Sequence, residues 1–156
     1  MKKYMKLMKR IGLVLLATLV VIQFFHPAKN EGTADGPNAM VLPADVKNIL
    51  ETSCFDCHSN HTNYPWYNNI QPVAWWLNDH VNEGKREINF SEFNTYKLKR
   101  KIKKMKEIRE QIDESEMPLT SYTLIHGNAK LTEAQKTRLL AWADSTKLSL
   151  ADTVGH

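Results

Sequence analysis

The chain has 156 residues, enough for one small domain and little more, and its formal net charge is +4 at pH 7. Residues 1–30 hold six of the 21 basic residues and none of the 17 acidic ones, so the remainder carries 15 basic and 17 acidic residues and a net charge of −2. Beyond its N-terminus the chain lacks the basic excess typical of nucleic-acid binding, and we expect no nucleic-acid partner.

The N-terminal 26 residues have the pattern of a targeting segment. Basic residues come first, and an apolar stretch follows from Ile11 to Phe25. This order predicts a signal or anchor in residues 1–26, with its basic end in the cytoplasm. Because no clear cleavage site follows, we expect a single uncleaved anchor that makes the cytoplasmic membrane a partner and places the chain at the bacterial cell membrane, with the remaining residues in the periplasm. The alternative is a cleaved signal and a soluble periplasmic protein.

The remainder of the chain predicts a tether and a helical domain. Residues 27–41 are rich in Gly, Pro, Asn and Asp, which is typical of a flexible tether. Helical spacing of apolar residues indicates four helices: one from Pro43 into residues 54–58, one from Pro72 to Gly84, one from Phe93 to Glu114, and one from Thr132 to about Thr146. No alternating strand pattern competes with them. We therefore predict an all-α domain over residues 42–148, followed by a C-terminal tail at 149–156.

Cys54 and Cys57 are the two cysteines of the chain and belong to a Cys-x-x-Cys-His motif that ends at His58. This motif is the attachment signature of a c-type haem. Two thiols add across the two vinyl groups of one haem, and cysteines at i and i+3 of a helical turn lie on one face, as this requires. His58 then lies beneath the iron as its proximal ligand. One motif predicts one covalently attached haem c per chain. Bacterial c-type haems are attached outside the cytoplasm, which agrees with the targeting segment.

Two other uses of these cysteines stay open. A bare Cys-x-x-Cys also occurs in thioredoxin-like dithiols, although these have a βαβ surrounding that the sequence does not indicate. A closed zinc site needs four ligands, and only His58 and His61 lie close to the cysteines.

The chain resembles the bacterial haem-binding domain family related to cytochromes c, over about residues 42–146. The resemblance rests on the motif and on several further stretches: residues 64–67, 72–76, 81–86, 89–92, 116–118, 122–126 and 129–132. It implies a small domain with the class I cytochrome c fold, in which the first and last helices pack together. The physiological role of such domains is poorly defined, so the resemblance indicates the cofactor better than the task.

The same resemblance nominates Met117, which precedes Pro118, as the sixth iron ligand on the haem face opposite His58. A thioether ligand favours ferrous iron and raises the reduction potential. The alternatives are that Met117 only fills a gap in the core, or that His61, His80 or His126 is the distal ligand. Four aromatic residues either pack on the porphyrin or belong to the ordinary core: Trp66, Tyr67, Trp75 and Trp76.

The third predicted helix has a strongly basic face. From Lys97 to Arg109 it carries eight basic residues and one acidic residue, Glu107. Such a face favours the docking of an acidic redox partner protein or contact with anionic lipid, but it is also typical of an ordinary solvated helix surface.

These observations together predict a membrane-tethered monohaem electron-transfer cytochrome with His58 and Met117 as axial ligands. No protein nucleophile or acid–base pair indicates an enzyme. The alternative function is a haem-based sensor or a peroxidase-like enzyme, either of which needs an open or labile sixth position on the iron.

Overall fold

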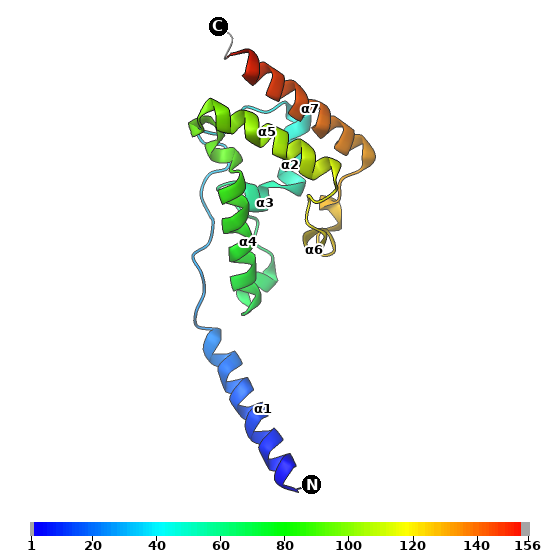
Figure 1. Cartoon of the computed structure of the whole chain (residues 1–156). Helices are drawn as coiled ribbons and strands as arrows, with labels where there is room; N and C mark the ends of the chain where they lie inside the picture. Colours follow the sequence, from blue (N-terminus) through cyan, green and yellow to red (C-terminus); the bar gives the residue numbers. More distant parts are fainter. Residues whose placement is uncertain (1, 154–156) are drawn as a thin grey trace.

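The computed structural model describes residues 2–153, and this part of the chain is built from helices (Figure 1). In chain order the elements are α1 (Lys2–Ile22), α2 (Ala44–Ser53), α3 (Phe55–His58), η1 (Trp66–Asn69), α4 (Val73–Glu87), η2 (Phe90–Thr95), α5 (Leu98–Asp113), α6 (Thr120–Thr123), η3 (Gly127–Ala129) and α7 (Glu133–Asp152), where η marks a 3₁₀ helix. The described residues form no strand, and one isolated bridge joins Glu31 and His61. This architecture agrees with the all-α part of the prediction.

The predicted membrane anchor is wrong. No helix within residues 2–153 is long and apolar enough to cross a membrane. Helix α1 has 21 residues, but its first half carries the basic residues, and the apolar part that follows runs only from Ile11 to Ile22. A membrane span needs about 20 apolar residues, and this stretch is shorter. The predicted location at a bacterial cell membrane depends on this single N-terminal anchor and is therefore wrong as well.

Helix α1 projects away from the other helices (Figure 1). Its end is joined to the domain through Gln23 and Gln71, whose backbone N–H donates to the Gln23 side chain at 2.9 Å. Residues 27–41, the predicted tether, make backbone contacts with the domain as well. The N–H of Thr62 donates to the Asn30 carbonyl at 3.0 Å, and the N–H of Met40 donates to the Phe90 carbonyl at 2.8 Å.

The core lies where α2, α3, α5 and α7 meet. Helices α5 and α7 pack along each other (Figure 1), and α2 contacts α7, the pairing expected of the first and last helices of the domain. The buried cluster contains the following residues: Val46, Leu50, Phe55, Ile88, Phe90, Phe93, Met105, Ile112, Leu139, Trp142 and Ala143. Burial of this apolar surface is the main force that holds the helices together.

Local sequence explains where two of the helices start. Pro43 precedes α2, and the predicted capping box at the start of α7 is present, because the side chain of Thr132 accepts from the N–H of Gln135 while Gln135 caps Thr132 in return. Two predicted ends are wrong. Helix α4 continues past Gly84 to Glu87, and α7 continues past Thr146 to Asp152.

Candidate functional site

The cysteine–histidine motif forms a single helical turn directly after α2. Cys54 ends α2, with its N–H bonded to the Leu50 carbonyl at 2.8 Å, and α3 follows at once. The N–H groups of Cys57 and His58 both donate to the Cys54 carbonyl, at 3.2 and 3.0 Å. Because this turn is helical, Cys54 and Cys57 are three residues apart on one face, which is the arrangement that the spacing predicts.

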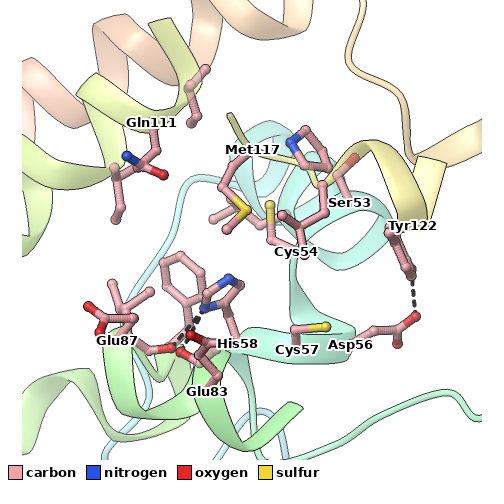
Figure 2. Close-up of a pocket in the computed structure, with 18 of the residues that line it drawn as sticks. Ser53, Cys54, Asp56, Cys57, His58, Glu83, Glu87, Gln111, Met117 and Tyr122 are labelled. Atoms are coloured by element: carbon pink, nitrogen blue, oxygen red, sulfur yellow. Dashed lines mark hydrogen bonds between the residues drawn. The ribbon is translucent and has the colours of Figure 1, made fainter. Parts of the chain in front are cut away.

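The motif lines a cavity of about 570 Å³ between the helices. Its wall is mostly apolar and comes from α2, α3, α4, α5, the segment after α5, and α6. Cys54, Cys57, His58 and Met117 all lie in this wall. Figure 2 shows the side chains of His58 and Met117 entering the cavity from different sides, one from α3 and one from the segment before α6. The structure thus brings together the four residues that the sequence nominates as the site, although their role as ligands stays a prediction.

The ring of His58 is held by the C-terminal end of α4. Its Nδ1 lies 2.9 Å from the Gly84 carbonyl and 3.1 Å from the Ile88 carbonyl. Since both partners are acceptors, Nδ1 carries the proton, and the lone pair is on Nε2. Burial lowers the pKa of His58, an effect that the two carbonyls partly oppose. His58 is therefore a neutral imidazole at pH 7, oriented as metal-binding histidines are oriented.

Gly84 allows α4 to come this close to the motif. A Cβ atom at Gly84 would lie 2.6 Å from the carbonyl oxygen of Cys57 and 3.0 Å from its Cβ. Only a residue without a side chain fits such an approach of two backbones. The sequence predicts a helix stop at Gly84, whereas its place in the last turn of α4 is a packing requirement.

Two buried phenylalanines pack at the motif. Phe55 and Phe90 stack with ring centroids 5.5 Å apart, and Phe90 meets the His58 ring edge-on at 6.5 Å. Both phenylalanines are buried, and Phe90 also lines the cavity. None of the aromatic residues singled out from the sequence (Trp66, Tyr67, Trp75 and Trp76) lines it, and Trp66 is 76% exposed.

The two cysteines are not arranged for dithiol chemistry. Burial raises the pKa of Cys54 to about 12 and the pKa of Cys57 to about 11, with smaller contributions from neighbouring negative charge. Both are therefore thiols at neutral pH, whereas reactive dithiols have lowered pKa values. As for zinc, residues 2–153 contain no group of three or more His, Cys, Asp or Glu side chains placed to hold a metal ion.

The rival histidine ligands lie in three different places. His80 lines the cavity and packs its ring against Trp76, with centroids 4.3 Å apart. His126 lies outside the cavity wall and contacts the hydroxyl of Tyr67 through Nε2, at 3.2 Å. His61 is exposed, and its Nδ1 meets the Gly32 carbonyl at 3.2 Å.

Four of the eight basic residues from Lys97 to Arg109 form ion pairs within the chain. Lys103 and Lys106 form i,i+4 ion pairs with Glu107 and Glu110, and Arg109 pairs with Asp113 and Asp144. Lys104, which lines the cavity, pairs with Glu87 of α4 at 3.0 Å and with Glu107 at 2.6 Å. These pairs fall in the second half of the face, so its positive charge is concentrated between Lys97 and Lys101. Docking of an acidic partner protein near Lys97–Arg109 stays a prediction.

Two residues of the site, Asp56 and Tyr122, are not indicated as site residues by the sequence pattern. The hydroxyl of Tyr122 donates to Asp56 Oδ2 at 2.7 Å, and both residues line the cavity (Figure 2). Asp56 occupies a variable position of the motif, and Tyr122 lies 66 residues further along the chain. The one signal available was the place of Tyr122 in the stretch that carries the family resemblance.

The cavity suits a haem by its size, its wall and its donors. Pockets for small molecules and cofactors are roughly 300–1,000 Å³ and mostly apolar, with a few polar groups at fixed positions. Here two thiols, a neutral imidazole with Nδ1 engaged elsewhere, and a thioether face one apolar space. The donor set matches the axial and covalent ligands of a c-type haem.

Comparison with known proteins agrees with this chemistry. The family model described as "Haem-binding domain" matches residues 17–145, which is most of the chain. No curated protein and no solved structure matches the chain.

Proposed function

The chain belongs to the haem-binding domain family, and we propose that it holds one haem covalently through Cys54 and Cys57 and serves as a monohaem electron carrier with His58 and Met117 as axial ligands. The observation that carries this proposal is the shared cavity, because four residues spread over 64 positions of the chain all lie in its wall. A haem bound there supplies reversible one-electron chemistry between ferric and ferrous iron.

Each residue has a distinct role in the proposal. Cys54 and Cys57 each add sulfur and hydrogen across one vinyl C=C bond, so that a C–S bond forms and no oxidant is consumed. His58 binds through Nε2, while Nδ1 donates to the carbonyls of Gly84 and Ile88 and so raises the basicity of the ring. Met117 offers a soft sulfur from the other side of the cavity, which favours the reduced state.

The same set of residues favours electron transfer over the alternative of a sensor or a peroxidase-like enzyme. Those functions require that a small ligand reach the iron at the sixth position. A thioether bound there competes with such ligands for the iron.

The absorption spectrum of the protein matured with haem tests the proposal in wild type, Met117→Ala and Met40→Ala. Met40 is a partly buried methionine outside the cavity wall and serves as the matched control. We expect a near-infrared charge-transfer band of sulfur-bound ferric iron in wild type and in Met40→Ala, and its loss in Met117→Ala. We also expect haem to remain with the chain after denaturation in wild type, but not in the Cys54→Ser, Cys57→Ser double variant.

Two results would contradict the proposal in different ways. Absence of covalently bound haem after expression with the maturation machinery would remove the cofactor assignment. A wild-type spectrum that is already high-spin, is unchanged in Met117→Ala and shifts on addition of cyanide or carbon monoxide would support the sensor or peroxidase function instead.

A further inference from the structure

The segment that carries Met117 has little secondary structure of its own. We call residues 114–126 the Met117 segment; it lies between the end of α5 and the 3₁₀ helix before α7 and contains the four-residue helix α6. The N–H groups of Glu116 and Met117 both return to the carbonyl of Gln111, at 2.9 and 3.1 Å. These bonds tie the segment to the end of α5 but not to the opposite side of the cavity.

Apolar packing of this segment is also weak. Leu124 is 80% exposed and Ile125 is 62% exposed, so these side chains contribute little burial. Leu119 lines the cavity but is still 36% exposed. A segment with exposed apolar side chains and short-range backbone bonds opens at low cost in free energy unless other contacts hold it.

A hydrogen bond from Tyr122 to Asp56 crosses the edge of the cavity and joins the segment to the motif (Figure 2). The donor–acceptor distance is 2.7 Å, as expected of a hydroxyl that donates to a carboxylate. The other oxygen of Asp56 accepts from the backbone N–H of Asn63 at 2.9 Å, which fixes the orientation of the carboxylate. Burial raises the pKa of Tyr122, and the bond to Asp56 raises it further, so the phenol keeps its proton and donates.

A second contact supports the Tyr122 ring. The rings of Tyr122 and His126 stack with centroids 4.3 Å apart, and Nε2 of His126 meets the hydroxyl of Tyr67 at 3.2 Å. Tyr67 belongs to η1, which is on the motif side of the molecule because η1 packs against α4. Two side-chain bonds, both at the α6 end, therefore connect the Met117 segment to the part of the chain that bears the motif.

We propose that Tyr122 is a positioning residue, which through its hydrogen bond to Asp56 holds the Met117 segment closed and so keeps small ligands away from the sixth position. The inference rests on the proposed function, because it assumes that Met117 is the sixth ligand. In this proposal Asp56, the second variable residue of the motif, anchors the segment that forms the opposite wall of the cavity.

The test measures how fast imidazole binds to the ferric holoprotein, together with amide hydrogen exchange over residues 114–126. Loss of a hydrogen bond to a charged group corresponds to roughly a 10- to 100-fold change in an equilibrium, so Tyr122→Phe is expected to raise imidazole association and segment exchange by about that factor. Asp56→Ala should match it, and the double variant should add nothing more. Asp56→Asn, which retains a partner for the phenol but no charge, should lie between these variants and wild type.

Tyr64→Phe is the matched control. Its hydroxyl also makes one hydrogen bond, accepting from the Asn30 N–H at 2.8 Å, but it lies outside the cavity wall. We expect imidazole binding and segment exchange in Tyr64→Phe to stay within about twofold of wild type. A merely structural role of Tyr122 would lower stability in the same way as Tyr64→Phe and leave both readouts unchanged, which would overturn the inference.

Met117→Ala separates this inference from the proposed function. If Met117→Ala binds imidazole faster but Tyr122→Phe does not, the ligand assignment holds and the positioning role is wrong. If Met117→Ala binds imidazole at the wild-type rate, the ligand assignment is wrong, and with it the claim that Tyr122 guards the sixth position.

Discussion

The His58 side and the Met117 side of the cavity are built by different means. On the His58 side the ring is gripped by two backbone carbonyls at the end of α4, and α4 touches the motif so closely that only glycine fits at residue 84. On the Met117 side a segment with one short helix is joined to the motif by the hydrogen bond of Tyr122 to Asp56, and to η1 by the hydrogen bond between His126 and Tyr67. Packed backbone therefore fixes the His58 side, whereas a few side-chain hydrogen bonds hold the Met117 side.

This difference implies an order of stability within the site. Backbone groups in packed helices open only with the domain, whereas a segment held by side-chain bonds opens locally. We therefore expect His58 to keep its place under conditions in which Met117 leaves the cavity. The variants below test the comparison by weakening each side in turn, starting with the largest expected loss.

Phe90→Ala should have the largest effect, because it removes a buried ring that packs against both Phe55 and His58. Truncation of a buried phenylalanine costs about 3–5 kcal/mol of unfolding free energy. Urea denaturation measures it. The matched variant on the other side is Leu119→Ala, whose side chain also lines the cavity but is 36% exposed, and for which we expect a loss of about 0.5 kcal/mol. Equal losses in the two variants would contradict the comparison.

Gly84→Ala should have the next largest effect. The new Cβ would meet the Cys57 carbonyl at 2.6 Å, so the backbone of α4 or of α3 must move. Overpacking of this kind costs about 1–3 kcal/mol, against a helix-propensity gain of about 1 kcal/mol.

Gly127→Ala is the matched glycine variant near the Met117 segment. Gly127 lies just beyond the segment, in η3, and a Cβ there has nothing within 4 Å. Its unfolding free energy should stay within about 0.5 kcal/mol of wild type in the same urea titration. A Gly84→Ala protein as stable as Gly127→Ala would show that the α3–α4 contact tolerates a side chain and is not the rigid side of the site.

The rigid side is also the side that the sequence predicts best. The spacing of Cys54, Cys57 and His58 is a local pattern, and a local pattern places three side chains on one helical turn without knowledge of the fold. The capping box at Thr132 is equally local and is confirmed. Gly84 shows the limit of such reasoning, because a glycine that ends a helix and a glycine that admits a neighbouring backbone have the same local signal.

The Met117 side depends on contacts between distant parts of the chain. Met117 was nominated through resemblance alone, and the bond between Asp56 and Tyr122 spans 66 residues with no periodicity to indicate it. The prediction of an N-terminal membrane anchor was wrong for another reason. Its basic and apolar order fits a targeting pattern, but that pattern does not measure length, and the apolar part of α1 is too short for a membrane span.

The smallest expected effect concerns the two ion pairs of Lys104, which lies on α5, the helix that leads into the Met117 segment. Lys104 binds both Glu87 and Glu107. Burial tends to raise the pKa of Glu107, but its hydrogen bonds to Lys104 and Lys103 leave that pKa below 4.5, and the hydrogen bond to Lys104 likewise lowers the pKa of Glu87. A carboxylate with a lowered pKa in the folded state stabilises it above its unfolded pKa, and this contribution is lost as the pH falls through the folded value.

Stability should therefore decline as the pH falls below about 4.5, and Glu107→Gln should flatten this decline while lowering stability at pH 7. The loss at pH 7 should be less than about 1 kcal/mol, because Glu107 is one-third exposed and such pairs are screened by solvent. Urea midpoints between pH 3 and pH 7 measure both quantities, with Glu110→Gln, from an exposed pair on the same helix, as the control. If the two variants had equal acid profiles, the pairing of Glu107 with Lys104 would stabilise the fold no more than an ordinary surface pair does.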